Sequence, residues 1–197
     1  MARIYIQDED RHVEGVEEIR TFLQPYGIWY ERWDVAGRLG ENPTDAEILE
    51  AYAPEIERLK GQGGYVTADV INVRPDLPNL DAMLEKFRSE HTHRDDEVRF
   101  IVHGAGVFHI HGNAGRPDAR VFAVQVEAGD LINVPAGTRH WFDLCQDRRI
   151  RAIRLFIDAA GWVPEYVEEG VHGGYQPLCF GPSYLPANAP RVAQLQL

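Results

Sequence analysis

The chain has few cysteines and no long apolar run. Only two cysteines, Cys145 and Cys179, occur among its 197 residues. Two cysteines do not imply a disulfide framework, so the sequence predicts two buried thiols, and we assign neither a catalytic role. No apolar stretch approaches the roughly 18 residues that span a bilayer, and residues 1–8 lack the apolar segment of a secretory signal. These absences predict a cytoplasmic protein with no membrane partner.

Positive charge is also scarce. The chain has 20 lysines and arginines against 31 aspartates and glutamates, which gives a formal net charge of -11. A phosphate backbone or an anionic membrane would require a concentrated basic surface, so nucleic acid is not an expected partner. The composition, 44% apolar and 26% charged, is that of an ordinary globular protein, and the length suits a single domain covering residues 1–197.

The first third of the chain mixes the patterns of strands and helices. Residues 2–7 read as a strand, and the apolar spacing of residues 16–23 predicts a helix. Thr44 and Glu47 have the spacing of a capping box at the start of a second helical pattern. Pro54 lies inside that pattern and should bend it or split it into two helices. We therefore expect an α/β decoration at about residues 1–64, packed against the remainder of the domain.

A run of short strands follows this region. Residues 65–73 are rich in β-branched side chains and predict a strand, and residues 79–88 predict a short helix. Further strands, separated by turns rich in glycine, are expected at 98–102, 107–111, 121–127, 131–134, 140–144 and 150–157. This spacing predicts a mainly β fold, α+β by content, with a small barrel or jelly roll at about 65–158 and an irregular tail at about 161–197.

The segment from His91 to Glu97 contains three candidate metal ligands. Side chains alternate across a strand, so His91 and His93 share a face. Glu97 and Arg99 keep the same parity if the strand continues, whereas a bulge near residues 95–96 would change the phase. Taken alone, the His-x-His pair also fits two polar residues on a solvated strand face.

The segment from Gly129 to His140 adds a fourth candidate. Residues 129–130 resemble a turn that enters a strand, and residues 135–137 resemble the turn that leaves it. This places His140 at the start of the next strand, where the mouth of a barrel can direct it inward. Such turns also occur in barrels that bind no metal, and His140, which precedes two aromatic residues, also fits a buried structural histidine.

Together the two segments supply three imidazoles and one carboxylate. This set suits a divalent ion such as iron, nickel, manganese, cobalt or zinc, and a site with open positions activates oxygen or polarises a substrate. The two segments resemble both motifs of the cupin superfamily of small conical β-barrels. The general pattern has glycine where Glu85 stands and asparagine where Leu144 stands, but neither departure removes a ligand. The resemblance implies as metal ligands His91, His93, Glu97 and His140.

The surrounding residues are similar, more narrowly, to the bacterial acireductone dioxygenases. The similar stretches cover most of the chain and include residues 64–70, 90–93 (Glu-His-Thr-His), 96–100, 127–132, 135–142, 154–156 and 161–162. The resemblance implies an enzyme of methionine salvage that oxidises the acireductone 1,2-dihydroxy-3-keto-5-methylthiopentene with O2, using Fe2+ or Ni2+. It implies formate and 4-methylthio-2-oxobutanoate as products with iron. With nickel it implies methylthiopropionate, carbon monoxide and formate.

Two arginines and two aromatic residues are candidates for contact with this substrate. Arg99 and Arg154 could stabilise an anionic enediolate, because a guanidinium stays protonated and presents a planar set of donors. For Arg154, an outward residue in a salt bridge is an equally good interpretation. Phe142 and Trp162 could form a wall around the thioether end of the substrate, although both also fit ordinary core positions.

The other histidines stay outside the predicted ligand set. His109 and His111 form a second His-x-His pair, but no carboxylate follows at a suitable spacing. If the residues that alternate with them face the core, these two histidines point outward into solvent. His12, His103 and His172 lie in polar or turn-forming surroundings.

Two alternative functions fit the same motifs. Another metallocupin, such as an isomerase or a different dioxygenase, would share the ligands but require other pocket residues. A non-catalytic cupin that binds a small molecule would need no metal or only a structural one. Oxygen uptake that depends on substrate distinguishes the enzyme from both.

Overall fold

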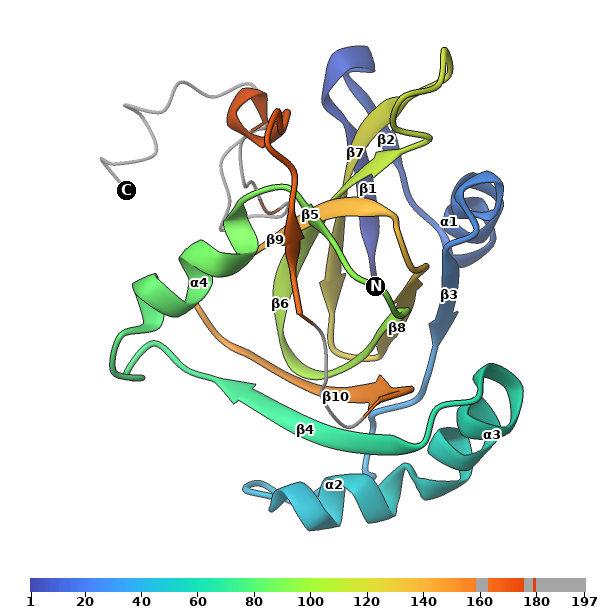
Figure 1. Ribbon diagram of the computed structural model, residues 1–197. Helices are drawn as coiled ribbons and strands as arrows, with labels where there is room; N and C mark the ends of the chain where they lie inside the picture. The colour runs from blue at the N-terminus through green and yellow to red at the C-terminus, as the bar shows by residue number, and fades with distance from the viewer. Residues whose placement is uncertain (159–162, 176–178, 180–197) are drawn as a thin grey trace.

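Strand pairing dominates the computed structural model, which describes residues 1–158, 163–175 and 179 (Figure 1). Its strands are β1 (Arg3–Ile6), β2 (Arg11–Val13), β3 (Trp29–Arg32), β4 (Thr67–Val73), β5 (His91–Thr92), β6 (Glu97–Gly112), β7 (Arg120–Glu127), β8 (Asp130–Val134), β9 (Arg139–Leu144), β10 (Ile150–Phe156) and β11 (Glu165–Tyr166). Its helices are α1 (Val16–Leu23), α2 (Asp45–Ala51), α3 (Ala53–Gly63) and α4 (Leu80–Arg88), with 3-10 turns η1 (Gln7–Glu9), η2 (Gln24–Tyr26) and η3 (His172–Gly174). The predicted mainly β fold is confirmed.

The strands form two sets that share β6. One set runs in the order β11-β5-β9-β6-β7-β1-β2, and β6 also pairs with β10 and β8, which in turn pair with β4 and β3. Residues 97–104 of β6 pair with β10 and β8, whereas residues 105–112 pair with β7 and β9. The predicted division of this segment into two strands, 98–102 and 107–111, with a glycine-rich turn between them is therefore wrong. The strand passes through it, and a register shift opposite Arg151 and Ala152 accommodates the change of partner.

Because β6 belongs to both sets, the fold is jelly-roll-like rather than a closed barrel in the residues described. Helices α2 and α3 lie against the outer side of β4 and β10 (Figure 1). Ile48 of α2 and Ile56 and Leu59 of α3 pack there against Phe100 and Ile153. The opposite side of these strands faces the larger core cluster, and it is this side that presents the residues of the site.

The N-terminal helices begin where the sequence predicts. The Thr44 hydroxyl accepts a hydrogen bond from the Glu47 backbone N–H at 3.2 Å, and the Glu47 carboxylate accepts one from the Thr44 N–H at 2.7 Å. These reciprocal bonds satisfy N–H groups that a helix start leaves without partners. Pro54 lies in the first turn of α3, so it separates α2 from α3 as predicted.

Helix α4 leads directly into the site. Leu80 and Leu84 are buried in the core, and Arg88 at its end donates to both carboxylate oxygens of Asp143 on β9, at 2.8 and 3.2 Å. This ion pair fixes the chain three residues before His91, the first candidate metal ligand. In the part of the chain that the structure describes, no helix has both the length and the apolar character required to cross a membrane.

Several short strands have no sequence signal. Strands β2 and β5 have three and two residues, too few to show alternation, and β3 is recognisable only through its pairing with β8. The expected irregular tail contains β11, which pairs with β5 in the register Glu165 with Thr92 and Tyr166 with His91. This pairing places residues 165–166 beside His91, the first candidate metal ligand.

The two cysteines correct the prediction of two thiols. Cys145 and Cys179 form a disulfide, with their Cα atoms 5.6 Å apart and both residues buried beside Val107 and Ala123. The sequence could not reveal the pair because 34 residues separate the cysteines, and the expected reducing compartment argued for thiols. Folding brings Cys179 against the outer face of β6 and β7.

We expect this disulfide to stabilise the folded protein. A bridge that closes a loop of this length contributes about 2–4 kcal/mol, mainly by restricting the unfolded chain. Cys145→Ser should lower the free energy of unfolding by that amount, and a reductant should lower it equally in the wild type but not in the variant. Chemical denaturation with and without reductant measures both. A wild-type protein that is indifferent to reductant contradicts the expectation.

Candidate metal centre

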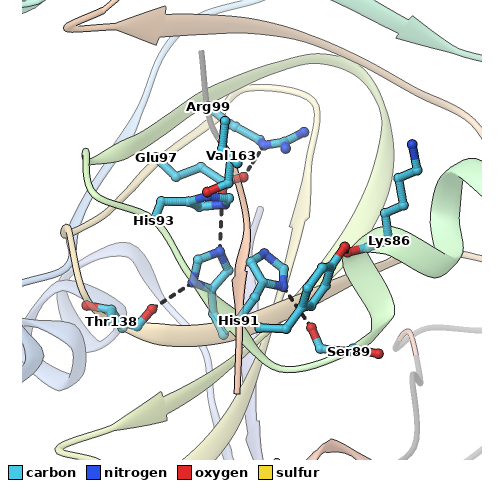
Figure 2. A network of polar contacts seen from close by, with 10 residues as sticks. Lys86, Ser89, His91, His93, Glu97, Arg99, Thr138 and Val163 are labelled. Carbon is cyan, nitrogen blue, oxygen red and sulfur yellow. Dashed lines mark hydrogen bonds and ion pairs between the residues drawn. The ribbon is translucent and has the colours of Figure 1, made fainter. Parts of the chain in front are cut away.

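The four predicted ligands meet on the core side of the sheet (Figure 2). His91 on β5 lies directly opposite His140 on β9, Glu97 begins β6, and His93 lies in the segment between β5 and β6. All four residues are at most 4% exposed. One nitrogen from each of the three imidazoles lies within 4.8 Å of the others. The chain therefore folds both motifs into one buried cluster.

Backbone carbonyls set the orientation of every imidazole. The Nδ1 atom of His91 lies 2.7 Å from the Ser89 oxygen, that of His93 3.1 Å from the Val163 oxygen, and that of His140 2.9 Å from the Thr138 oxygen. A carbonyl oxygen only accepts, so each Nδ1 carries the proton that it donates. Each Nε2 lone pair is then left for the centre of the cluster, as in metal-binding histidines.

Glu97 completes the donor set. Its Oε2 atom lies 3.0 Å from Nε2 of His140 and 3.2 Å from Nε2 of His93, while Oε1 accepts a 2.5 Å hydrogen bond from Nε of Arg99. In the tautomers fixed by the backbone, the two Nε2 atoms and the carboxylate oxygen are all acceptors. Acceptors this close require a cation or a proton between them. The residues present therefore fit a divalent metal bound by His91, His93, Glu97 and His140.

The surroundings shift the pKa values of the candidate ligands in different directions. Burial, assisted by the nearby His140, lowers the pKa of His91 to about 4. Burial also lowers the pKa of His93, but its hydrogen bond to Glu97 and the charge of that carboxylate outweigh burial, and the net pKa is raised. For Glu97, burial raises the pKa, but Arg99 and the two adjacent imidazoles hold the pKa well below its usual range. Near neutral pH, Glu97 is thus a carboxylate and His91 a neutral imidazole.

We expect protons to compete with the metal at His93 before they compete at His91. A metal binds the neutral imidazole, so affinity falls as pH drops through the pKa of a ligand. Because the pKa of His93 is raised, protons should begin to displace the metal from His93 above the usual histidine pKa of about 6.5. At His91 they should do so only near pH 4. Imidazole nitrogen NMR of the metal-free protein measures the order, and chelator competition across pH measures affinity. Protonation of His91 before His93 contradicts this expectation.

Asp96 joins the two motifs. Its Oδ1 atom accepts a 3.0 Å hydrogen bond from the Ala136 N–H, and its Oδ2 atom accepts from the Asn133 amide at 3.1 Å and the Tyr65 hydroxyl at 3.2 Å. In the same place the Gly137 N–H donates to the His93 carbonyl at 2.9 Å, and Gly137 has a φ of 73°, which glycine adopts most readily. The turn before His140 is therefore fastened to the segment that carries the other ligands.

Arg99 is the cation of the site. It is 6% exposed, binds Glu97 through Nε, and lies over the rings of Phe142 and Phe108 at 5.4 and 5.8 Å. The predicted shared parity of Glu97 and Arg99 is confirmed by this contact. Phe142 itself packs against Phe108 with ring centroids 4.8 Å apart. Two aromatic faces thus adjoin the guanidinium next to the metal ligands.

Arg154 forms the salt bridge that one of its two interpretations expected, but it lies on the same side of the sheet as Arg99 and not on the outer side. It stands directly opposite Arg99 in the β10–β6 pairing, so the two side chains leave the sheet on the same side. It also forms a two-pronged ion pair with Asp69 of β4, with Nε–Oδ1 and Nη2–Oδ2 distances of 2.9 and 2.6 Å. Trp162, the other predicted pocket residue, lies outside the described residues.

The second His-x-His pair is separate from the centre but is not solvated as predicted. His109 and His111 alternate with Ile110, which pairs opposite His140, so they lie on the other face of β6. His109 is 2% exposed and stacks on Trp141, and the Nδ1 atom of His111 lies 2.7 Å from Oε1 of Glu90. The alternation of side chains along a strand does not reveal which residues pack against His109 and His111 on this outer face.

Residues 163–175 supply contacts that sequence reasoning missed. The buried Glu90 carboxylate accepts a 2.6 Å hydrogen bond from the Val171 N–H, and the Tyr166 hydroxyl donates to the Lys86 carbonyl at 3.1 Å. Val163 orients His93 through its backbone oxygen, which no side-chain pattern reports. Glu90 was detectable only as the neighbour of His91 in the motif.

A buried set of three histidines and one glutamate on the core side of a jelly-roll-like sheet defines a metal-binding cupin. Within that class, the model of the ARD/ARD' family matches residues 3–164, and the chain belongs to this family. The family predicted from the sequence is confirmed.

Named relatives agree with this assignment. The acireductone dioxygenase of Picosynechococcus sp. is 40% identical over 180 residues, which cover 90% of this chain and 99% of that protein. The Bacillus cereus protein of the same name is 42% identical over 174 residues, covering 84% of this chain and 100% of its own length. A solved structure of acireductone dioxygenase from Bacillus anthracis, with a cadmium ion in its active centre, has a TM-score of 0.78 at 42% identity and covers 84% of this chain and 98% of that one.

Proposed function

We propose that the protein is a metal-dependent dioxygenase of methionine salvage that cleaves the acireductone 1,2-dihydroxy-3-keto-5-methylthiopentene with O2. The observation that supports this most strongly is the convergence of three Nε2 atoms and a carboxylate beside a buried guanidinium. The partners are a small molecule and O2, and the location is cytoplasmic.

Fe2+ or Ni2+ is the proposed metal, one per chain, held by His91, His93, Glu97 and His140. Imidazole and carboxylate ligands accept both ions, so the residue types do not select between them. When bound, the metal acts as a Lewis acid that favours the anionic form of the enediol and fixes its oxygens for reaction with O2. Iron would then direct the reaction to formate and 4-methylthio-2-oxobutanoate, and nickel to methylthiopropionate, carbon monoxide and formate.

Arg99 is the proposed electrostatic partner of the anionic substrate. Deprotonation makes the enediol electron-rich, and a buried guanidinium stabilises negative charge more strongly than one in water. The positive charge of Arg99, whose Nε atom lies 2.5 Å from Oε1 of Glu97, also lowers the pKa of Glu97 and so keeps this carboxylate ionised. Arg99 thus holds a ligand and faces the substrate from one position.

Phe142 is proposed as a wall of the pocket, since its ring lies under the Arg99 guanidinium and against Phe108. Arg154 is proposed as a second cation on the same side of the sheet, restrained by Asp69. Trp162 is proposed as a further wall of the pocket, at the thioether end of the substrate.

Two rival functions share the fold. Another metallocupin would bind metal through the same ligands but leave this acireductone unconsumed, and a non-catalytic cupin would bind a small molecule without turnover. The intact ligand set argues against the non-catalytic cupin, and membership of the ARD/ARD' family favours the dioxygenase over another metallocupin.

Product identification tests the proposal. Metal-free protein loaded first with Fe2+ and then with Ni2+ should consume O2 with acireductone and form the two different product sets, while elemental analysis reports metal per chain. The same products with both ions would overturn the metal-dependent branch. Metal binding without oxygen uptake would support a different metallocupin.

A further inference from the structure

A polar cleft of about 320 Å³ has none of the four candidate metal ligands among its lining residues. Its walls are the η2 turn with Tyr26, the loop after β6 with Asn113 and Arg116, and the start of β9 with Thr138 and Arg139. Arg139 pairs opposite His111, so both side chains project from the face of the sheet opposite to His140. The cleft therefore lies at the end of β6 and β9, where Arg139 and His111 are on the outer face and the Tyr26 ring is on the inner face against Phe122.

Unpaired positive charge gathers in this cleft. Within the described residues, the lysines and arginines pair with carboxylates except Lys86, Arg116, Arg139 and Arg149, and two of these four line this cleft. None of its described lining residues has a carboxylate. In a chain of formal charge -11, a cleft with two unpaired guanidiniums is an unusual concentration of positive charge.

The walls of the cleft are held in place. Asn113 donates to Asp118 at 2.8 Å, and the Arg116 N–H donates to the Asn113 carbonyl at 2.9 Å, so the loop that presents Arg116 is closed by its own hydrogen bonds. The Tyr26 ring packs on Phe122 and lies so close to Gly112 that a Cβ atom there would clash with it. The cleft is thus built into the fold rather than formed by side chains that meet by chance.

We propose that this cleft binds a small molecule through a phosphoryl group. Each guanidinium presents a planar fork of donors that suits the oxygens of an oxyanion, and two forks offer more donors than one carboxylate can accept. Tyr26 and Thr138, which also line the cleft, carry hydroxyl groups that can donate to the same oxyanion. The volume suits a metabolite rather than a polymer, because small-molecule pockets begin near about 300 Å³.

Calorimetry on the metal-loaded enzyme at low ionic strength tests this proposal. The probes are inorganic phosphate and glycerol phosphate, which separate free phosphate from a phosphate ester, and acetate serves as the carboxylate comparison. We expect at least one of the two phosphate probes to bind saturably, with one molecule per chain, and acetate to bind more weakly. Arg116→Ala and Arg139→Ala should each weaken phosphate binding about tenfold or more.

The matched control is Arg149→Ala, which removes an exposed and equally unpaired arginine outside the cleft. This variant should bind phosphate as the wild type does. Absence of saturable binding overturns the proposal, as does equal loss in Arg149→Ala or acetate binding as tight as that of phosphate. Phosphate binding that persists in the Arg116→Ala, Arg139→Ala double variant places the anion elsewhere, including at the metal, and also overturns it.

Discussion

His140→Ala should strip the protein of most of its metal and nearly all of its oxygenase activity. The substitution removes one of four buried donors and leaves Glu97 without the imidazole 3.0 Å from its Oε2 atom. Changing groups that merely orient ligands costs about 10- to 100-fold in metal affinity, so loss of a ligand should cost at least about 100-fold. Chelator competition measures the affinity, and oxygen uptake measures turnover.

The control for this substitution is His103→Ala, which removes an exposed histidine from β6 outside the ligand cluster. It should retain the metal affinity and turnover of the wild type. Circular dichroism of both variants separates loss of metal from loss of fold. Full metal content in folded His140→Ala would show that the metal binds elsewhere.

Arg99→Met should lower turnover about 100-fold, the effect expected when one group that stabilises developing charge is removed. The substitution keeps an apolar stem over Phe108 and Phe142 but removes the positive charge beside Glu97. Without that charge the pKa of Glu97 should rise, because the guanidinium is the strongest of the influences that lower it. Steady-state oxygen uptake gives kcat and KM, and elemental analysis gives the metal content.

Arg99→Lys distinguishes charge from hydrogen-bond geometry at the same position. An ammonium group supplies the charge but not the planar fork, so Arg99→Lys should retain metal and recover only part of the lost turnover. Arg151→Lys on β10 is the matched control, because Arg151 pairs with Asp45 and not with a metal ligand. A wild-type kcat in Arg99→Met would contradict a role for Arg99 in turnover.

Much of the fold follows from local sequence because its signals are short-range. The capping box at Thr44, the proline that separates α2 from α3 and the glycine-rich turns each act within a few residues, and the structure places the elements accordingly. The four candidate ligands were predicted from the spacing within each motif and from the family resemblance that joins the two motifs. Strand alternation alone does not bring them together, because His93 lies outside a strand.

The features that the sequence does not reveal depend on contacts between distant segments. The single strand β6 changes partners where two strands and a turn were expected, because its pairing with β10, and not its local composition, keeps it extended. The disulfide requires Cys179 to return to the sheet, and the carbonyl that orients His93 belongs to Val163, 70 residues further along the chain. Tertiary contacts of this kind leave no periodic pattern.

The most direct test of the central claim compares metal-loaded and metal-free protein for oxygen consumption with acireductone. The account predicts that the loaded protein consumes O2 only when substrate is present. It also predicts that chelation abolishes this activity, and that one equivalent of Fe2+ or Ni2+ per chain restores it. Full activity in the metal-free protein, or no activity at full metal occupancy, would contradict the account.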